Sequence, residues 1–365
     1  MIDLEKYNYD LPEGLIRKQG IEPRDSARLF VYDTKTDTVT HAVFSELPKF
    51  LPTDSVMVLN NTKVVPARLF LKKETGGKIE VFVLANEIDL HACDAETEIP
   101  VLVDRKCMVG WKIYFPNKDY FEVARQEENK FFVKLHSEKN LEELLKQYGE
   151  TPIPHYLEDT KAQPRVGLQA TLYGNENEVI LRKRYQTIFA EGGASVAAPT
   201  ASLHFTEQVF LDLNAKGVEF SEVTLDVGMG TFAPLKDEHF LSGKLHSEKI
   251  AVSEEAAEIV NRAKNEHRQV IAVGTTAMRT LESCAKDERV QPLIKNTDIF
   301  IYPPYHFQIA DILLTNFHVP KSSLMLLVDA FLADKQAKRN IMDLYAIAIE
   351  ENYAFYSFGD SMLIL

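Results

Sequence analysis

The C-terminal half of the chain carries a pattern of apolar and polar positions that predicts helices alternating with buried strands. Residues 253–267, SEEAAEIVNRAKNEH, begin with a capping serine and two glutamates, and their apolar positions fall on one helical face. The apolar run QVIAV, followed by Gly274, predicts a buried strand, and AMRTLESCA predicts a second helix. This order indicates a largely parallel sheet covered by helices.

Three further segments extend this α/β pattern. SEVTLDV, residues 221–227, and IFIY, residues 299–302, predict two more strands. Thr206 can open a helix and Gly217 can close it, because a hydroxyl caps the first turn and glycine adopts the left-handed conformation.

The pattern changes between Ala67 and Thr151. Six short runs there alternate with a period of two and are separated by turns: RLFLKK, KIEVFVLA, EIPVLVD, WKIYF, FEVARQ and KFFVKLH. Such spacing is typical of a small barrel or sandwich. Because α/β patterning resumes after Pro152 and Pro154, we expect a discontinuous α/β domain, residues 1–66 and 152–365, interrupted by a β-barrel domain, residues 67–151. Residues Lys161–Glu178, rich in polar residues and glycine, predict a long loop.

Composition narrows the class of protein. The 365 residues carry a formal charge of −13, which argues against a cationic coat for nucleic acid but leaves room for a local basic patch. The longest apolar stretch, SLMLLVDAFLA, is interrupted by Asp329 and is too short to span a membrane, and the first residues show no secretory pattern. We therefore expect a cytoplasmic monomer. Cys93, Cys107 and Cys284 lack C-x-x-C spacing, which predicts buried thiols rather than disulfides or a metal site.

Two basic stretches stand out against the acidic background. Lysines and arginines outnumber glutamates by three between residues 63 and 80, where Lys63, Arg68, Lys72, Lys73 and Lys78 face Glu74 and Glu80. The run Arg182-Lys183-Arg184 has no adjacent acid. Each stretch is either a solvated surface or an anion-binding patch.

Two turns that follow predicted strands are candidate ligand positions. Gly274-Thr275-Thr276 would offer hydroxyls and the free N–H groups of a helix N-terminus, although an ordinary helix cap has the same sequence. Gly228, Gly230 and Ala233 satisfy a loose dinucleotide-binding spacing, but Pro234 and charged residues follow where a helix is required. We reject a nicotinamide site and expect these glycines to let backbone approach a ligand.

Two histidines share a setting beside loops. His204 lies in SVAAPTASLHFT and His318 in TNFHVP, each after an apolar residue. A neutral imidazole there could act as a general base, because its pKa is closest to neutrality, or it could be a structural core residue.

Ten blocks in the same order make the chain similar to one family. It resembles S-adenosylmethionine:tRNA ribosyltransferase-isomerases, enzymes of the queuosine pathway, from Tyr9 to Leu363. The blocks are YDLPEGLI, LNNTKVVPARL, TGGKIEVFVL, RYQTIFA, SVAAPTASLHFT, TLDVGMGTFAPL, LHSEKI, AVGTTAMRTLES, TNFHVPKSSLMLLVDAF and FYSFGDSML.

The resemblance implies an α/β domain split by a β-barrel and an unusual reaction. The ribosyl part of S-adenosylmethionine, a co-substrate, passes to 7-aminomethyl-7-deazaguanine in tRNA and gives epoxyqueuosine, adenine and methionine. The sulfonium acidifies the neighbouring C5′ proton and is itself the electrophile, so no metal is expected.

Roles follow for particular residues of this chain. We expect His204, His318 and Asp226 to be catalytic, with His204 the preferred base. Substrate-binding candidates are Pro199, Thr200, Ala201, Ser202, Gly228, Gly230, Thr231, Thr275, Thr276, Arg279 and Asn316. The expected tRNA contacts are Lys63, Arg68, Arg182, Lys183 and Arg184.

Five positions depart from the family pattern, namely Ser202, Asp226, Pro304, Gln308 and Ala354. They leave two alternatives open beside the family reaction. One is a ribosyl or adenosyl transferase acting on another nucleoside or RNA, and the other is a non-catalytic RNA-binding relative.

Overall fold

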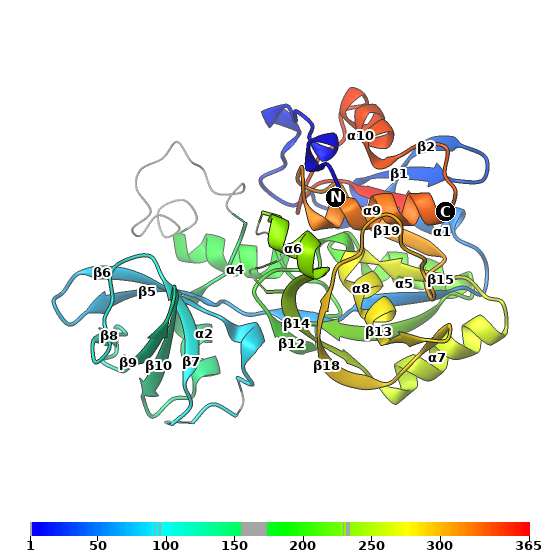
Figure 1. Ribbon diagram of the computed structural model, residues 1–365. Helices are drawn as coiled ribbons and strands as arrows, with labels where there is room; N and C mark the ends of the chain where they lie inside the picture. The colour runs from blue at the N-terminus through cyan, green and yellow to red at the C-terminus, as the bar shows by residue number, and fades with distance from the viewer. Residues whose placement is uncertain (1, 91, 95, 155–173, 229, 231–233) are drawn as a thin grey trace.

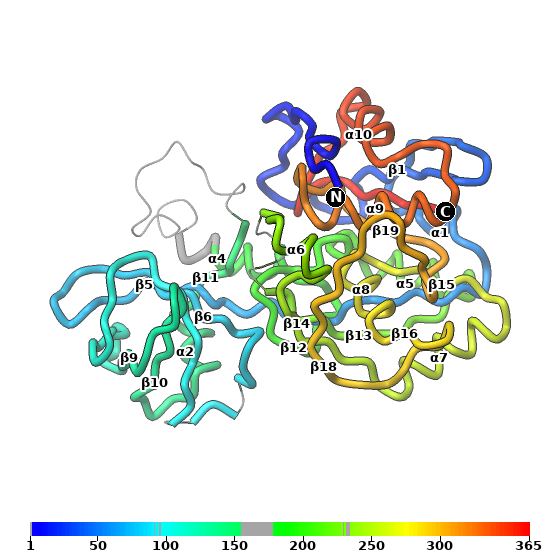
Figure 2. The backbone as a smooth tube through the Cα atoms, in the orientation of Figure 1, coloured from blue at the N-terminus to red at the C-terminus, as the bar shows by residue number. Residues whose placement is uncertain are grey.

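The computed structural model describes residues 2–90, 92–94, 96–154, 174–228, 230 and 234–365. Figure 1 shows two sheet-based parts side by side, with both chain termini on the larger one. The backbone tube in Figure 2 shows the chain entering and leaving the smaller part on the side that faces the larger one.

The larger part is built on a nine-stranded sheet with the order β18-β14-β13-β3-β15-β19-β20-β1-β2. Its strands are β1 Arg28–Asp33, β2 Thr38–Val43, β3 Val56–Asn60, β13 Glu219–Leu225, β14 Lys244–Val252, β15 Val270–Val273, β18 Leu293–Ile299, β19 Ile312–Asn316 and β20 Ser361–Ile364. Four of the neighbouring pairs are parallel. The other four are antiparallel, so the sheet is mixed, and the expectation of a largely parallel sheet is wrong.

Helices cover both faces of this sheet. They are α1 Leu47–Phe50, α5 Glu207–Ala215, α6 Asp237–Ser242, α7 Glu254–Asn265, α8 Gly274–Cys284, α9 Ser323–Asp334 and α10 Ile341–Glu350. On β15, Val270 and Ala272 pack in the core with α7 to α10, whereas Ile271 and Val273 pack in the core with α1 and α5. The sandwiched strands are therefore buried on both faces, as an apolar run without alternation predicts.

The local signals for helices hold, whereas one predicted strand is wrong. Ser253 accepts a hydrogen bond from Ala256 N at the start of α7, and Thr206 caps α5 in the same way. Gly217 follows α5 with φ +83°, a conformation that favours glycine. The predicted strand at residues 299–302 is shifted, because β18 ends at Ile299 and the chain then runs into Pro303 and Pro304.

The smaller part is a seven-stranded antiparallel sheet with its own core. Its strands are β5 Arg68–Lys73, β6 Lys78–Val83, β7 Ile99–Val103, β8 Lys112–Tyr114, β9 Tyr120–Glu127, β10 Lys130–His136 and β11 Gly149–Glu150. Helix α2, Leu141–Tyr148, lies between β10 and β11 in the chain. The six predicted period-two runs are thus confirmed as strands β5 to β10. Strand β5 pairs with β6 on one edge and with both β11 and β8 on the other.

The two parts are connected by two chain crossings that pair with each other. Strand β4, Thr62–Val64, leads toward the smaller sheet, and β12, Gly192–Ser195, returns from it in parallel pairing. The Asp226 carboxylate accepts hydrogen bonds from Thr62 Oγ1 and from Ala194 N, both at 2.8 Å. This buried carboxylate therefore fastens one crossing to the other.

Shorter elements complete the fold. Helix α4, Gly174–Arg184, begins within the segment for which we expected a loop, so that prediction is wrong for Gly174–Glu178, and residues 161–173 lie outside the described residues. Short 3-10 turns occur at Leu4–Tyr7, Glu13–Leu15, Arg24–Ser26, Phe44–Glu46, Ala85–Glu87 and Thr200–Ser202, and β16 Ala285–Lys286 pairs with β17 Arg289–Val290.

Gly193→Ala should weaken the connection between the two parts. Gly193 has φ +68°, and a Cβ there would lie 2.1 Å from Asp226 Oδ1. The strain of a left-handed alanine and the steric clash should together lower the free energy of unfolding by about 2–4 kcal/mol. Urea unfolding measures the change.

Gly76→Ala is the matched control, because Gly76 also has a positive φ, +81°, but a Cβ added there would have no atom within 4 Å. It should cost only the backbone strain, about 1 kcal/mol. Equal losses in the two variants would mean that Asp226 does not hold this joint.

Candidate functional site

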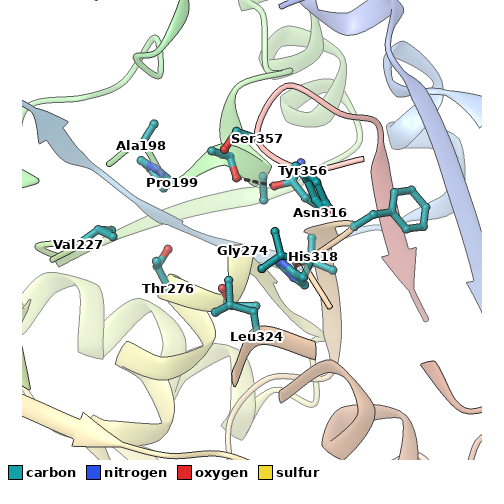
Figure 3. A pocket seen from close by; sticks show the side chains of 16 residues that line it. Ala198, Pro199, Val227, Gly274, Thr276, Asn316, His318, Leu324, Tyr356 and Ser357 are labelled. Atoms are coloured by element: carbon teal, nitrogen blue, oxygen red, sulfur yellow. Dashed lines mark hydrogen bonds between the residues drawn. The ribbon is translucent and has the colours of Figure 1, made fainter. Parts of the chain in front are cut away.

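A cavity lies where β15 and β19 end side by side. These parallel neighbours are followed by Gly274–Thr276 and by Phe317–Val319, and both segments line the cavity. The segment with Ala198 and Pro199 and the loop with Tyr356 and Ser357 approach from other parts of the chain (Figure 3). The carboxyl edge of a sheet is the usual ligand position in such folds. The cavity is partly open to solvent.

Two buried polar groups in the cavity lack hydrogen-bond partners. Asn316 is 3% exposed, and its Oδ1 accepts from Thr200 Oγ1 at 2.8 Å, but its Nδ2 has no partner among the described residues. The same holds for Thr276 Oγ1 in the first turn of α8. An unpaired buried donor costs about 1–3 kcal/mol, and each of these groups can donate a hydrogen bond to an acceptor atom of a ligand.

His318 lines the same cavity as a neutral imidazole. Burial lowers its pKa from the ordinary value of 6.5 to about 3. Its Nε2 lies 2.9 Å from Thr315 Oγ1, and its backbone N–H donates to the Tyr345 hydroxyl at 2.7 Å. In the described part of the chain no hydrogen bond reaches Nδ1, so this nitrogen remains available to a ligand.

His204 occupies a different environment. It is 4% exposed and is absent from the lining of the cavity. Its Nδ1 lies 3.1 Å from the Arg24 carbonyl and its Nε2 lies 2.8 Å from the Gly359 carbonyl. Burial lowers its pKa, and the two carbonyls oppose that effect. Both ring nitrogens therefore lie next to backbone carbonyls, and the imidazole links the segment at Arg24 to the loop at Gly359.

The structure brings together seven of the predicted site residues and separates the others. The cavity is lined by Pro199, Thr200, Ala201, Thr275, Thr276, Asn316 and His318. Ser202, like His204 and Asp226, is buried outside the lining, and Thr231 lies outside the described residues.

Gly228 and Gly230 line a second hollow, next to the smaller sheet, together with Asn86, Lys130 and Glu248. Glu248 Oε1 accepts from Gly228 N at 3.1 Å, and Glu248 Oε2 accepts from Arg279 Nη1 in a buried ion pair. Arg279 thus acts on Gly228 through Glu248, and it does not line the first cavity.

Sequence reasoning missed several residues that line the cavity, namely Ala198, Val227, Thr315, Phe317, Val319, Leu324, Tyr356 and Ser357. Thr315, Phe317 and Val319 adjoin predicted residues and follow from the end of β19. Tyr356 and Ser357 come from the last loop of the chain. A signal for them exists only in the block FYSFGDSML.

Three of the five basic residues expected to bind tRNA make contacts within the protein. Arg182 donates to Glu178 and to the Lys146 carbonyl, both at 2.9 Å, and to the Gly149 carbonyl. Arg68 is 8% exposed, 3.4 Å from Glu80, and Arg184 lies 3.7 Å from Glu22. Lys63 and Lys183 are exposed.

Glu150 in β11 pairs with Arg68 in β5. Burial, followed by the nearby Glu178 carboxylate, raises the pKa of Glu150 to about 7. Arg68 and Arg182 oppose this effect, so their charges act within the protein.

Cysteines and other metal-ligating groups do not assemble in the described ranges. Cys107 and Cys284 are buried as predicted, whereas Cys93 is partly exposed. Over those ranges no cluster of three or more His, Cys, Asp or Glu side chains could hold a metal ion. No described helix is long and apolar enough to cross a membrane.

Comparisons with known proteins cover the whole chain. A family model described as queuosine biosynthesis protein matches residues 4–364. The chain is 42% identical to an S-adenosylmethionine:tRNA ribosyltransferase-isomerase of Carboxydothermus hydrogenoformans, over 99% of each chain. It is 41% identical to the protein of that name from Clostridioides difficile, over 98% of each chain.

A crystal structure of S-adenosylmethionine tRNA ribosyltransferase from Thermotoga maritima is also similar, with a TM-score of 0.53 and 28% identity over 99% of this chain and 100% of that one. The mixed sheet, the cavity at its carboxyl edge and these full-length matches lead to one conclusion: the chain belongs to the queuosine biosynthesis protein family, whose curated members are named S-adenosylmethionine:tRNA ribosyltransferase-isomerases.

Proposed function

We propose that this chain transfers the ribosyl part of S-adenosylmethionine onto 7-aminomethyl-7-deazaguanine in tRNA and isomerises it. The products are epoxyqueuosine in the tRNA, adenine and methionine. Membership of the family over the full length supports this reaction. The observation that carries the assignment of the site is the unpartnered Asn316 Nδ2 in the cavity that His318 also lines.

The cavity is the proposed S-adenosylmethionine site. Asn316 Nδ2 and Thr276 Oγ1 can hydrogen-bond to ribose, adenine or carboxylate acceptors, and the N-terminus of α8 favours a carboxylate. None of the five positions that depart from the family pattern lines this cavity. This supports the family reaction over an altered substrate.

His318 is the proposed base, in place of the preferred His204. In the tautomer that donates Nε2–H to Thr315 Oγ1, Nδ1 carries the lone pair that a base needs. Desolvation keeps the ring unprotonated before the reaction. The adjacent sulfonium lowers the pKa of the C5′ proton, which favours its transfer to a neutral imidazole. The sulfonium also supplies the electrophile, so this chemistry calls for no metal.

His204 and Asp226 are proposed to position the machinery rather than react. His204 ties the loop at Gly359, next to Tyr356 and Ser357, to the turn Thr200–Ser202. Asp226 fastens the two crossings. Each acts on the shape of the site through other residues.

Residues 67–151 are proposed to form an inserted β-barrel domain, and residues 1–66 and 152–365 the discontinuous α/β domain. The pairing circuit β5-β6-β7-β10-β9-β8 supports a barrel, because β8 pairs back to β5 through Lys72 and Tyr114. A separate core of residues from these strands and α2 supports a domain.

The proposed partners are S-adenosylmethionine and a tRNA, bound by a cytoplasmic monomer. The exposed Lys63 and Lys183 remain candidate phosphate contacts. Arg68, Arg182 and Arg184 are better explained as links within the protein.

Incubation with S-adenosylmethionine and a tRNA that carries 7-aminomethyl-7-deazaguanine tests the reaction. We expect adenine release together with modification of the tRNA, because the reaction couples the two. Chromatography of free adenine and mass spectrometry of digested tRNA measure them. Adenine release without tRNA modification would indicate another acceptor, and binding without adenine release would indicate a non-catalytic relative.

His318→Gln should lower turnover by about 10²- to 10⁴-fold while S-adenosylmethionine binds within a few-fold of wild type, because a general base is lost. His204→Gln is the matched comparison. It should lower the melting temperature first, since its imidazole links two loops. The assignment is wrong if a folded His204→Gln protein loses turnover and His318→Gln does not.

The neutral state of His318 also predicts how stability depends on pH. The folded-state pKa is below the unfolded value, so between pH 6.5 and about 3 only the unfolded chain takes up this proton. Stability should therefore fall as the pH decreases below 6.5. Between pH 7.5 and pH 5, the free energy of unfolding of His318→Gln should fall by about 2 kcal/mol less than that of the wild type. Urea unfolding at the two pH values measures the difference. Parallel losses in both proteins would contradict a buried neutral imidazole.

A further inference from the structure

A row of five side chains crosses five strands of the smaller sheet. The register pairs Lys78 with Lys72, Lys72 with Tyr114, Tyr114 with Tyr120, and Tyr120 with His136. The row therefore runs without interruption from β6 through β5, β8 and β9 to β10. We call these five residues the lysine–tyrosine row.

The row lies on the outer face of the sheet. Successive side chains of a strand point to opposite faces, and the residues next to the row are core residues. These buried neighbours are Ile79, Leu71, Ile113, Phe121 and Leu135. Lys72, Lys78 and His136 are exposed, and the two tyrosines are half-buried. The row is thus accessible along its length.

The three aromatic members are neighbours, and two of them stack, because the Tyr114 and Tyr120 rings are tilted by 45° whereas Tyr120 and His136 are nearly parallel. The ring centroids of Tyr114 and Tyr120 are 5.5 Å apart, and those of Tyr120 and His136 are 4.5 Å apart with an interplanar angle of 11°. Lys112 Nζ lies 4.8 Å from the centroid of Tyr120. Glu122 Oε2, 3.1 Å from His136 Nε2, fixes the orientation of the outermost ring.

We propose that the lysine–tyrosine row is a second contact surface for the tRNA, separate from the cavity. Lys72 and Lys78 bind phosphates, and an unpaired base stacks on the face of His136 opposite Tyr120. Cations that follow a backbone and aromatic rings that receive bases are the combination used for single-stranded nucleic acid. This inference rests on the proposed function, which supplies the tRNA.

Charge and position favour RNA over a protein partner. None of the five residues of the row is acidic, although Glu122 contacts His136 and the chain as a whole has a charge of −13. Figure 1 places β8 and β9 on the side of the smaller sheet away from α8 and β19, which carry the cavity. A long polyanion can reach both places at once, whereas Arg68 and Arg182 are engaged within the protein.

Four full-length variants test the row by their tRNA dissociation constants over a range of salt. Lys72→Gln with Lys78→Gln should weaken binding about 5- to 50-fold at 0.1 M salt and reduce the log–log salt slope by about two. His136→Ala should weaken it about 5- to 150-fold, whereas His136→Phe should stay within about three-fold because it retains a stacking ring. Lys286→Gln with Lys338→Gln removes the same charge from exposed sites on the larger part and should stay within about two-fold.

S-adenosylmethionine binding should be unchanged in all four variants, since the row is outside the cavity, and thermal unfolding checks that each variant is folded. Wild-type tRNA affinity in both row variants would overturn the proposal and leave the face to a protein partner. Weaker binding in the lysine variant alone would overturn the stacking contact. Wild-type protein that binds tRNA through the row but never modifies it would contradict the proposed function and not the row.

Discussion

The buried Asp226 carboxylate is the interaction on which the relation between the two sheets depends. It accepts from the Thr62 hydroxyl, at the start of the outgoing crossing, and from Ala194 N–H, on the returning one. A buried carboxylate is stable only when hydrogen bonds replace its lost hydration, so both crossings must stay in place. The ends of β3 and β13 are fixed nearby, because Asn60 Oδ1 accepts from Thr62 N and from Leu225 N.

Local signals in the sequence predicted elements well. The capping serine and apolar face of α7 and the alternation of β5 to β10 depend on neighbours within a few residues. Strand direction in the large sheet was not predictable in this way. It depends on which strands become neighbours, and β20, at the end of the chain, pairs with β19 in one direction and β1 in the other.

The candidate site shows the same limit more sharply. The sequence brought forward both His204 and His318, because each follows an apolar residue beside a loop. Their roles separate only through distant partners: Gly359 is 155 residues from His204, and Arg24 is 180 residues away. Arg182 is similar, since a count of charges cannot show that its guanidinium faces backbone carbonyls and Glu178.

The paired crossings have a mechanical consequence. A module on one flexible linker can swivel freely, but β4 and β12 attach the smaller sheet at two points and hydrogen-bond to each other. Because side chains alternate along a strand, a slip of one residue would turn Thr62 away from Asp226. The double attachment therefore restricts how far the smaller sheet can rotate or move away from the cavity.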